Sequence, residues 1–270
     1  MWLPANLALL CAALLAAFGN MGRHFVPRIS EATREAAYVF LLYALWRLFN
    51  VVELHLGGAY QNGRQIWRLE RAVGVGSERW LQTHALPHPL VVQFANAYYA
   101  IAHVPATIVC LFWLFFRHRR AYRHWRSVLA VTTAISVIMH LVPVAPPRLF
   151  PDLGFVDTAV LYHQSVYGNV GAGVSDQFAA MPSIHAAWAL LICAAALSVS
   201  RSRWRWLGVG HAVLTLLSIS ITANHWWLDS LAAAALVGAI SSVRRRIMPS
   251  ADGGCGCPQL ARRPIVKNGV

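Results

Sequence analysis

Negative charge and lysine are scarce in this chain of 270 residues. It contains 10 acidic residues, and its lysine content is the single residue Lys267. Charged residues of both signs make up 12% of the sequence, whereas hydrophobic residues make up 57%. An ordinary soluble domain is excluded, because such domains carry about 25% charged residues. The composition instead predicts a polytopic helical membrane protein.

The positive charge comes from arginine and is unevenly placed. The net charge is +13, with 22 arginines. Eleven of them lie in the connectors 117–126, 201–205 and 244–246, whereas the connection 146–183 holds Arg148 alone. Basic clusters between apolar runs follow the positive-inside rule and do not form a nucleic-acid footprint. We therefore expect no nucleic-acid partner, the clusters on the cytoplasmic side and the connection 146–183 on the other side.

Cysteine is also too sparse to define a disulfide framework. Three of the five cysteines lie within apolar runs, and Cys255 and Cys257 lie in a Gly-rich tail. No disulfide pattern or zinc spacing follows from them. The tail pair is best interpreted as reduced, unstructured thiols, with lipidation or metal binding left open.

Apolar runs define the expected architecture, an all-α membrane bundle of six core transmembrane helices plus a probable N-terminal one. We expect a marginal span and a connector broken by Pro27 in residues 1–35, a catalytic membrane domain in 36–246 and a disordered cytoplasmic tail in 247–270. Whether the chain has six or seven spans stays open. The expected spans are 3–18, 36–52, 89–116, 128–145, 184–200, 206–223 and 228–243. Tryptophans near their ends are predicted to be interface anchors: Trp204, Trp206, Trp226 and Trp227.

Residues 56–88 are too polar to span a membrane. Within them, 61–73 shows the periodicity of an amphipathic helix that lies along the interface. Four arginines in this segment oppose the charge rule above: Arg64, Arg68, Arg71 and Arg79. Contacts with lipid phosphates would explain them.

One carboxylate stands out in the second half of the chain. Between Asp176 and Asp252 the only acidic residue is Asp229, four positions after His225. In a helix this spacing places both side chains on one face. Ionisable groups at the edge of a membrane segment are costly, and their default interpretation is functional. A second histidine, His185, lies at the start of another apolar run.

These residues resemble the type 2 phosphatidic acid phosphatase superfamily, and within it the branch of inositol phosphorylceramide synthases and their actinobacterial relatives. The family motifs K-x6-R-P, P-S-G-H and S-R-x5-H-x3-D correspond here to the stretches 146–151, 182–185 and 225–229. Leu141 replaces the lysine of the first motif, and Ile219 replaces the arginine of the third. These departures are familiar in the inositol phosphorylceramide synthase branch, and they weaken the assignment as a plain phosphatase.

The resemblance implies a role for each matching residue. It makes His225 the nucleophile, which becomes phosphorylated, Asp229 the residue that orients it, and His185 the general acid and base. Arg148 and Ser183 correspond to the phosphate-binding residues, and neither a metal nor another cofactor is implied.

Four further residues are candidates for substrate binding. Tyr99 and His103 match a Tyr/His pair of the same branch, although packing between helices explains them equally well. Asp157 would either bind a polyol acceptor or cap a turn. His163 would help to compensate for the missing cations.

The sequence thus predicts a multi-pass enzyme of the cell membrane with its active site on the extracytoplasmic side. Its substrate would be a lipid or polyprenyl phosphate, or a phosphoinositol-type headgroup, and the acceptor would be water, a polyol or a sugar. The connection 146–183 is expected to select that acceptor. A catalytically weakened transporter or membrane scaffold is the alternative. The oligomeric state stays open.

Overall fold

The computed structural model describes residues 5–21, 27–53, 57–75, 78–164 and 177–247. Over these residues the regular structure is helical, with one isolated β-bridge between Val144 and Ala179, which confirms the all-α class. Cys255, Cys257 and the Gly-rich run 168–173 lie outside the described residues. The elements are α1 (Ala5–Met21), α2 (Pro27–Glu53), α3 (Ala59–Ala72), α4 (Glu78–Ala85), α5 (Pro89–Ile101), α6 (His103–Arg117), α7 (Arg119–Met139), the 3-10 helices η2 (Pro147–Leu149) and η3 (Pro151–Leu153), α8 (Thr158–Leu161), α9 (Ile184–Val199), α10 (Arg205–Ile221) and α11 (Trp227–Ile247).

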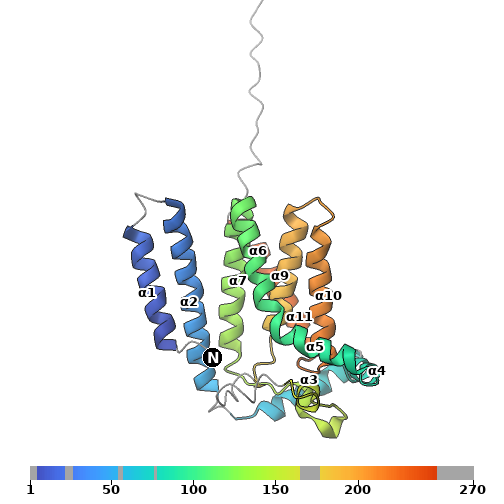
Figure 1. Ribbon diagram of the computed structural model, residues 1–270. Helices are drawn as coiled ribbons and strands as arrows, with labels where there is room; N and C mark the ends of the chain where they lie inside the picture. The colour runs from blue at the N-terminus through green and yellow to red at the C-terminus, as the bar shows by residue number, and fades with distance from the viewer. Residues whose placement is uncertain (1–4, 22–26, 54–56, 76–77, 165–176, 248–270) are drawn as a thin grey trace, which may run out of the picture.

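Helix α9 forms the centre of the bundle and contacts α6, α7, α10 and α11 (Figure 1). Its buried face is rich in alanine, and small side chains let neighbouring helices approach closely. On α10, a Cβ added at Gly208 would lie 2.9 Å from the Cβ of Ala196. This close packing joins α10 to the second half of α9, and the candidate site lies at the opposite, N-terminal end of α9.

The apolar run 89–116 was expected to form one helix, and the structure corrects this. It is divided into α5 and α6, which are bent by 51° relative to one another. Pro105 explains the break, because a proline cannot donate a helical hydrogen bond and its ring clashes with the carbonyl four residues earlier, here that of Ile101. The bend brings residues of both helices to the candidate site.

Helices α1 and α2 form a hairpin beside the bundle (Figure 1). Helix α2 begins at Pro27, so the expected connector was wrong in placing this proline outside a helix. Proline is favoured at the first position of a helix, where no backbone donor is needed. Two ion pairs join α2 to α7: Glu31 lies 2.7 Å from Arg119, and Glu35 pairs with Arg126.

The number of membrane spans stays a prediction. Among the described residues, α11 is long and apolar enough to cross a membrane, and the bent pair of α5 and α6 would be a second span. Helices α1, α9 and α10 are apolar but shorter. At about 1.5 Å per residue, a 16-residue helix such as α9 covers roughly 24 Å, less than a hydrocarbon core of about 30 Å.

The two ends of the bundle differ in the charged residues and the segments that they contain. The arginine clusters lie at the α6–α7 junction, the α9–α10 connection and the end of α11, all at the upper end in Figure 1. The amphipathic helix expected over 61–73 is present as α3, whose location at the interface stays a prediction, and it lies with α4 and the segment between α7 and α9 at the lower end. There Ala145 donates its amide to the carbonyl of Ala59, and a Cβ at Gly63 would lie 2.6 Å from the Ala145 oxygen.

The tryptophans divide between the two ends. Trp204 and Trp206 are exposed, as expected of anchors. Trp226 is fully buried, so the anchor interpretation was wrong for this residue. Its indole Nε1–H donates to the Ala145 carbonyl at 2.9 Å, and its ring packs against Phe150.

Candidate active site

Four rings meet where the α5–α6 bend, the start of α9 and the α10–α11 connection converge. The ring of His185 is stacked on that of Tyr99 with centroids 4.3 Å apart, and it lies 4.2 Å from that of His103. The rings of His185 and His225 are 5.7 Å apart. The structure therefore brings together residues that the sequence separates by more than 100 positions. Tyr99 and His103 are packed between helices and also border the two histidines, so both interpretations of this pair remain.

His225 has a defined tautomer. Its Nδ1 lies 2.9 Å from the carbonyl oxygen of Ala180, and because a carbonyl only accepts, Nδ1 carries the hydrogen. Nε2 is then the basic nitrogen, and it is buried without a hydrogen-bond partner among the described residues. Burial lowers the pKa of His225, and the positive charge of Arg148 lowers it further. The imidazole is therefore neutral at physiological pH.

Asp229 contacts His225 in a way that the spacing did not predict. Helix α11 begins at Trp227, so His225 precedes the helix and the expected shared helical face is wrong. The Oδ2 atom of Asp229 accepts the amide of Trp226 at 2.8 Å and lies 3.4 Å from Nδ1 of His225. An acidic residue at the third helical position that reaches back to the N-cap amide forms half of a capping box. Asp229 thus shapes the turn that carries His225 as well as facing its ring.

Ser183 is the N-cap of α9. It is fully buried, and its Oγ accepts the amide of Ala186 at 3.2 Å. His140, at the end of α7, is also buried, and its Nε2–H donates to the carbonyl of Pro182 at 3.4 Å. The start of α9 is thus held from inside by its own cap and from outside by α7.

Arg148 is a buried guanidinium on η2. Its Nε–H donates to Asn224 Oδ1 and its Nη1–H donates to Asp157 Oδ2, both at 2.8 Å. Asp157 also caps α8, because its Oδ1 accepts the amides of Ala159 and Val160. Of the two expectations for Asp157, the structure confirms the cap. The ion pair between Asp157 and Arg148 was not expected.

His163 is not among the rings that converge. It is exposed just after α8, with a backbone φ of 54°. Its expected role in charge compensation stays a prediction without a supporting contact among the described residues.

Four residues that contribute to the site were not predicted from the sequence. Ala180 acts through a backbone carbonyl, which has no sequence signature. Asn224 could have been noticed as a polar residue directly before His225. Buried Glu70 and Glu78 contact α11, and their signal was the presence of carboxylates in an arginine-rich segment.

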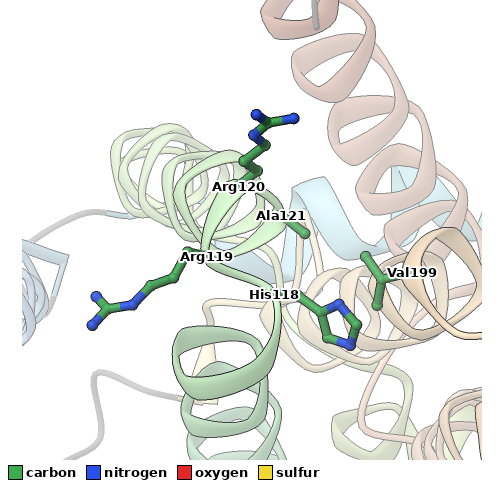
Figure 2. A pocket seen from close by; sticks show the side chains of 5 residues that line it. All are labelled: His118, Arg119, Arg120, Ala121 and Val199. Atoms are coloured by element: carbon green, nitrogen blue, oxygen red, sulfur yellow. The ribbon is translucent and has the colours of Figure 1, made fainter. Parts of the chain in front are cut away.

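A pocket of about 410 Å³ lies at the other end of α6, and Figure 2 shows its lining residues. His118 and Val199 lie close together there, whereas the side chains of Arg119 and Arg120 extend away in different directions. Helix α6, which is 15 residues or about 22 Å long, separates this pocket from His103. In the described part of the chain, no group of three or more His, Cys, Asp or Glu side chains is arranged to hold a metal ion.

The described structure is an all-helical bundle with buried imidazoles, an ion-paired arginine and a serine-capped helix at one end. Residues 64–243, more than half of the chain, match the model of the PAP2 superfamily, so the chain belongs to the type 2 phosphatidic acid phosphatase superfamily. Membership supports phosphatase or phosphotransferase activity on lipid phosphates in general. The match does not extend to the inositol phosphorylceramide synthase-like branch, which stays a prediction. Searches of curated proteins and of solved structures gave no match.

Proposed function

We propose that this protein is an integral-membrane phosphatase or phosphotransferase that forms a phosphohistidine at His225 from a lipid or polyprenyl phosphate. The observation that carries the proposal is the unpartnered, buried Nε2 of a neutral imidazole whose Nδ1–H is fixed by Ala180. A nucleophile needs a free electron pair in a fixed direction. Superfamily membership supports the same class of reaction.

In the first step, Nε2 of His225 attacks phosphorus, a P–N bond forms and the bond from phosphorus to the lipid oxygen breaks. His185 donates a proton to the departing oxygen, and its ring lies beside that of His225, with centroids 5.7 Å apart. In the second step, an acceptor hydroxyl attacks phosphorus, the P–N bond breaks and His185 takes the acceptor's proton.

Arg148 and Ser183 stabilise the phosphoryl oxygens in this proposal. A guanidinium held by two partners is pre-organised, so little conformational entropy is lost when it binds an anion. Ser183 adds a hydroxyl at the N-terminus of α9, where amides also favour negative charge. The first-motif lysine and the third-motif arginine have no equivalents. Leu141 occupies the position of the lysine, and Ile219, which occupies that of the arginine, is buried in the apolar core.

The acceptor in this proposal is an alcohol such as a polyol or a sugar, with water as the competing acceptor. The missing cations favour transfer, because a site with fewer phosphate contacts depends more on a bound acceptor to complete the reaction. A phosphoinositol-type headgroup is the donor that the predicted branch would use.

We place the site on the extracytoplasmic side of a multi-pass membrane protein. The arginine-rich connectors lie at the opposite end of the bundle from His225, which supports this orientation under the positive-inside rule.

The test is to trap the intermediate. Purified protein is incubated with a lipid phosphate labelled with ³²P, quenched in alkali and compared with the His225→Ala variant. We expect label that is stable to base and labile to acid in the wild type, and none in the variant. His118→Ala, a histidine at the opposite end of α6, is the control and should keep the label. Label that persists in His225→Ala would contradict the assignment of the nucleophile. Chase with water, inositol or a sugar then distinguishes hydrolysis from transfer.

A further inference from the structure

The first turn of α11 takes its hydrogen-bond partners from two other helices. The amide of Leu228 donates to Oε1 of Glu70 on α3 at 2.8 Å, and the amide of Trp227 donates to Oε1 of Glu78 on α4. The first amides of a helix have no partner within it and are usually capped by a neighbouring residue. Here residues about 150 positions away provide the caps.

Both glutamates are buried, with 3% of Glu70 and 1% of Glu78 exposed. A buried carboxylate is costly unless it is hydrogen-bonded or protonated. Burial raises the pKa of both groups, and the carboxylate of Asp229 raises that of Glu70 further. A hydrogen bond between the two side chains lowers the pKa of Glu70 and raises that of Glu78. The pKa values of the two carboxyl groups are therefore both raised and depend on one another.

Few other charges face the pair. Helix α11 contributes Asp229, and α10 presents the carbonyl of Ile221, which accepts from Gln82 of α4. Two arginines of α3 and α4 are exposed and have contacts elsewhere: Arg71 lies over the ring of Trp67, and Arg79 lies at the turn of Gly154. The amides of Trp227 and Leu228 compensate part of the charge of the two glutamates.

The clamped turn connects directly to the candidate site. It follows His225 in the chain, and the carbonyl of Asp229 accepts the amide of Ser183 at 3.3 Å. Movement of this turn would displace the proposed nucleophile and the cap of α9 together.

We propose that Glu70 and Glu78 form a clamp that caps the first amides of α11, holds the N-terminus of this helix and thereby positions His225. The inference rests on the proposed role of His225 as nucleophile. The clamp residues do not touch the substrate, so they are positioning residues.

The experiment compares Glu78→Leu with Glu78→Gln. The leucine removes the cap, and we expect kcat to fall by roughly 10²-fold with donor KM changed by less than about twofold, because a small misplacement of a reacting group has this cost. Amide exchange in a peptide that contains 226–229 should become roughly five- to tenfold faster. The glutamine keeps an acceptor for Trp227 and donates to Glu70 as the protonated acid does, so kcat should return to near the wild-type value.

The pH profile gives a readout that loss of structure would not imitate. Wild-type kcat should fall as the pH rises past about 8, where Glu78 loses its proton, and Glu78→Gln should remove this alkaline loss. Glu31→Leu, which removes a carboxylate paired with Arg119 at the opposite end, is the matched control and should leave kcat unchanged.

Three results would overturn the clamp: full activity in Glu78→Leu, equal impairment in Glu78→Gln, or an alkaline loss that persists in Glu78→Gln. If wild-type protein turned over no lipid phosphate, the proposed function would fail. The clamp would still be decided by amide exchange and by the ¹⁵N signals of the His225 ring, which report its tautomer without turnover. Unchanged signals in Glu78→Leu would then overturn the clamp, and a shifted signal with faster exchange would support it.

Discussion

The Nδ1–H of His225 donates to the backbone carbonyl of Ala180 at 2.9 Å, a shorter contact than the 3.4 Å to the carboxylate of Asp229. A carbonyl can only accept, so it fixes the tautomer whatever the protonation state of neighbouring side chains. The carboxylate is then left with two tasks, which are to stabilise a positive imidazole and to accept the amide of Trp226.

This arrangement predicts a moderate effect of Asp229→Asn. The asparagine oxygen can still accept the Trp226 amide, and Ala180 still holds the ring. We expect kcat to fall by roughly 10²-fold, less than the roughly 10⁴-fold loss known where a carboxylate alone sets the tautomer. Steady-state kinetics on a labelled lipid phosphate measures this. A 10⁴-fold loss would show that Asp229, and not Ala180, fixes the ring.

Arg148→Lys should be strongly impaired. An ammonium cannot bind Asn224 and Asp157 and also present a planar fork to two phosphate oxygens. We expect kcat/KM to fall by roughly 10²-fold. Arg64→Lys is the matched control, because Arg64 also pairs with an aspartate, Asp152, but on the exposed surface, where such pairs contribute little. Similar losses in both variants would contradict a special role for Arg148.

Asp157→Asn should separate the two contacts of Asp157. Asparagine is a good N-cap, so α8 should persist, whereas the ion pair with Arg148 is lost. We expect the donor KM to rise several-fold because Arg148 loses a fixed orientation. Both KM values are measured in a transfer assay with a polyol. A rise in the acceptor KM alone would instead support direct binding of the acceptor by Asp157.

Folding stability should fall as the pH rises from 7 to 9. The pKa values of Glu70 and Glu78 are raised in the folded protein to about 7 and about 8 from an ordinary value of 4.5, so the folded state binds more protons than the unfolded state. The stabilisation is complete below pH 4.5 and is lost as the pH rises through the folded values. Above pH 7 an ordinary histidine of pKa about 6.5 contributes little to the slope. Thermal midpoints in detergent should therefore decline over this interval, and less steeply in Glu78→Gln. Midpoints that rise in the wild type would contradict the direction of these shifts.

Two glycines of α10 offer a matched test of the packing against α9. A Cβ at Gly208 would meet Ala196 at 2.9 Å and the carbonyl of Ile192 at 3.3 Å, whereas a Cβ at Gly210 meets nothing within 4 Å. Gly208→Ala should lower the thermal midpoint, because overpacking typically costs about 1–3 kcal/mol. Gly210→Ala should leave it unchanged or raise it, since alanine is the better helix former. Equal midpoints in the two variants would show that α9 and α10 can move apart without loss of folding stability.

Patterns of hydrophobicity predicted most of the helical segments, and side-chain chemistry with the motif context predicted part of the set of residues that meet at the site. The apolar runs identified the helical segments, and His185, Ser183 and His225 were found from their chemistry and motif context. The break at Ala102 was missed because the composition of 89–116 is continuously apolar, although Pro105 carried the signal. A hydropathy profile shows how apolar a segment is, and it does not show where a helix bends.

What escaped prediction depends on the backbone and on long-range contacts. The Ala180 carbonyl is chemically identical to any other, so only the fold reveals its role. Trp226 and Trp204 look alike as aromatic residues at helix ends, yet one is buried against Phe150 and the other is exposed. The contact of Glu70 with α11 escaped prediction because its partner, the amide of Leu228, is distant in sequence.

The cap at Ser183 restricts which residues can occupy its position. Serine, threonine, aspartate and asparagine all accept an amide well at a helix N-terminus. A hydroxyl has one hydrogen as well as two lone pairs, so it can accept from Ala186 and donate to an anion at the same time. Aspartate would cap equally well but would repel a phosphate, and threonine would add a methyl group to a site with no exposed surface. At this position, serine is the smallest residue that can both cap the helix and donate a hydrogen bond to an anion.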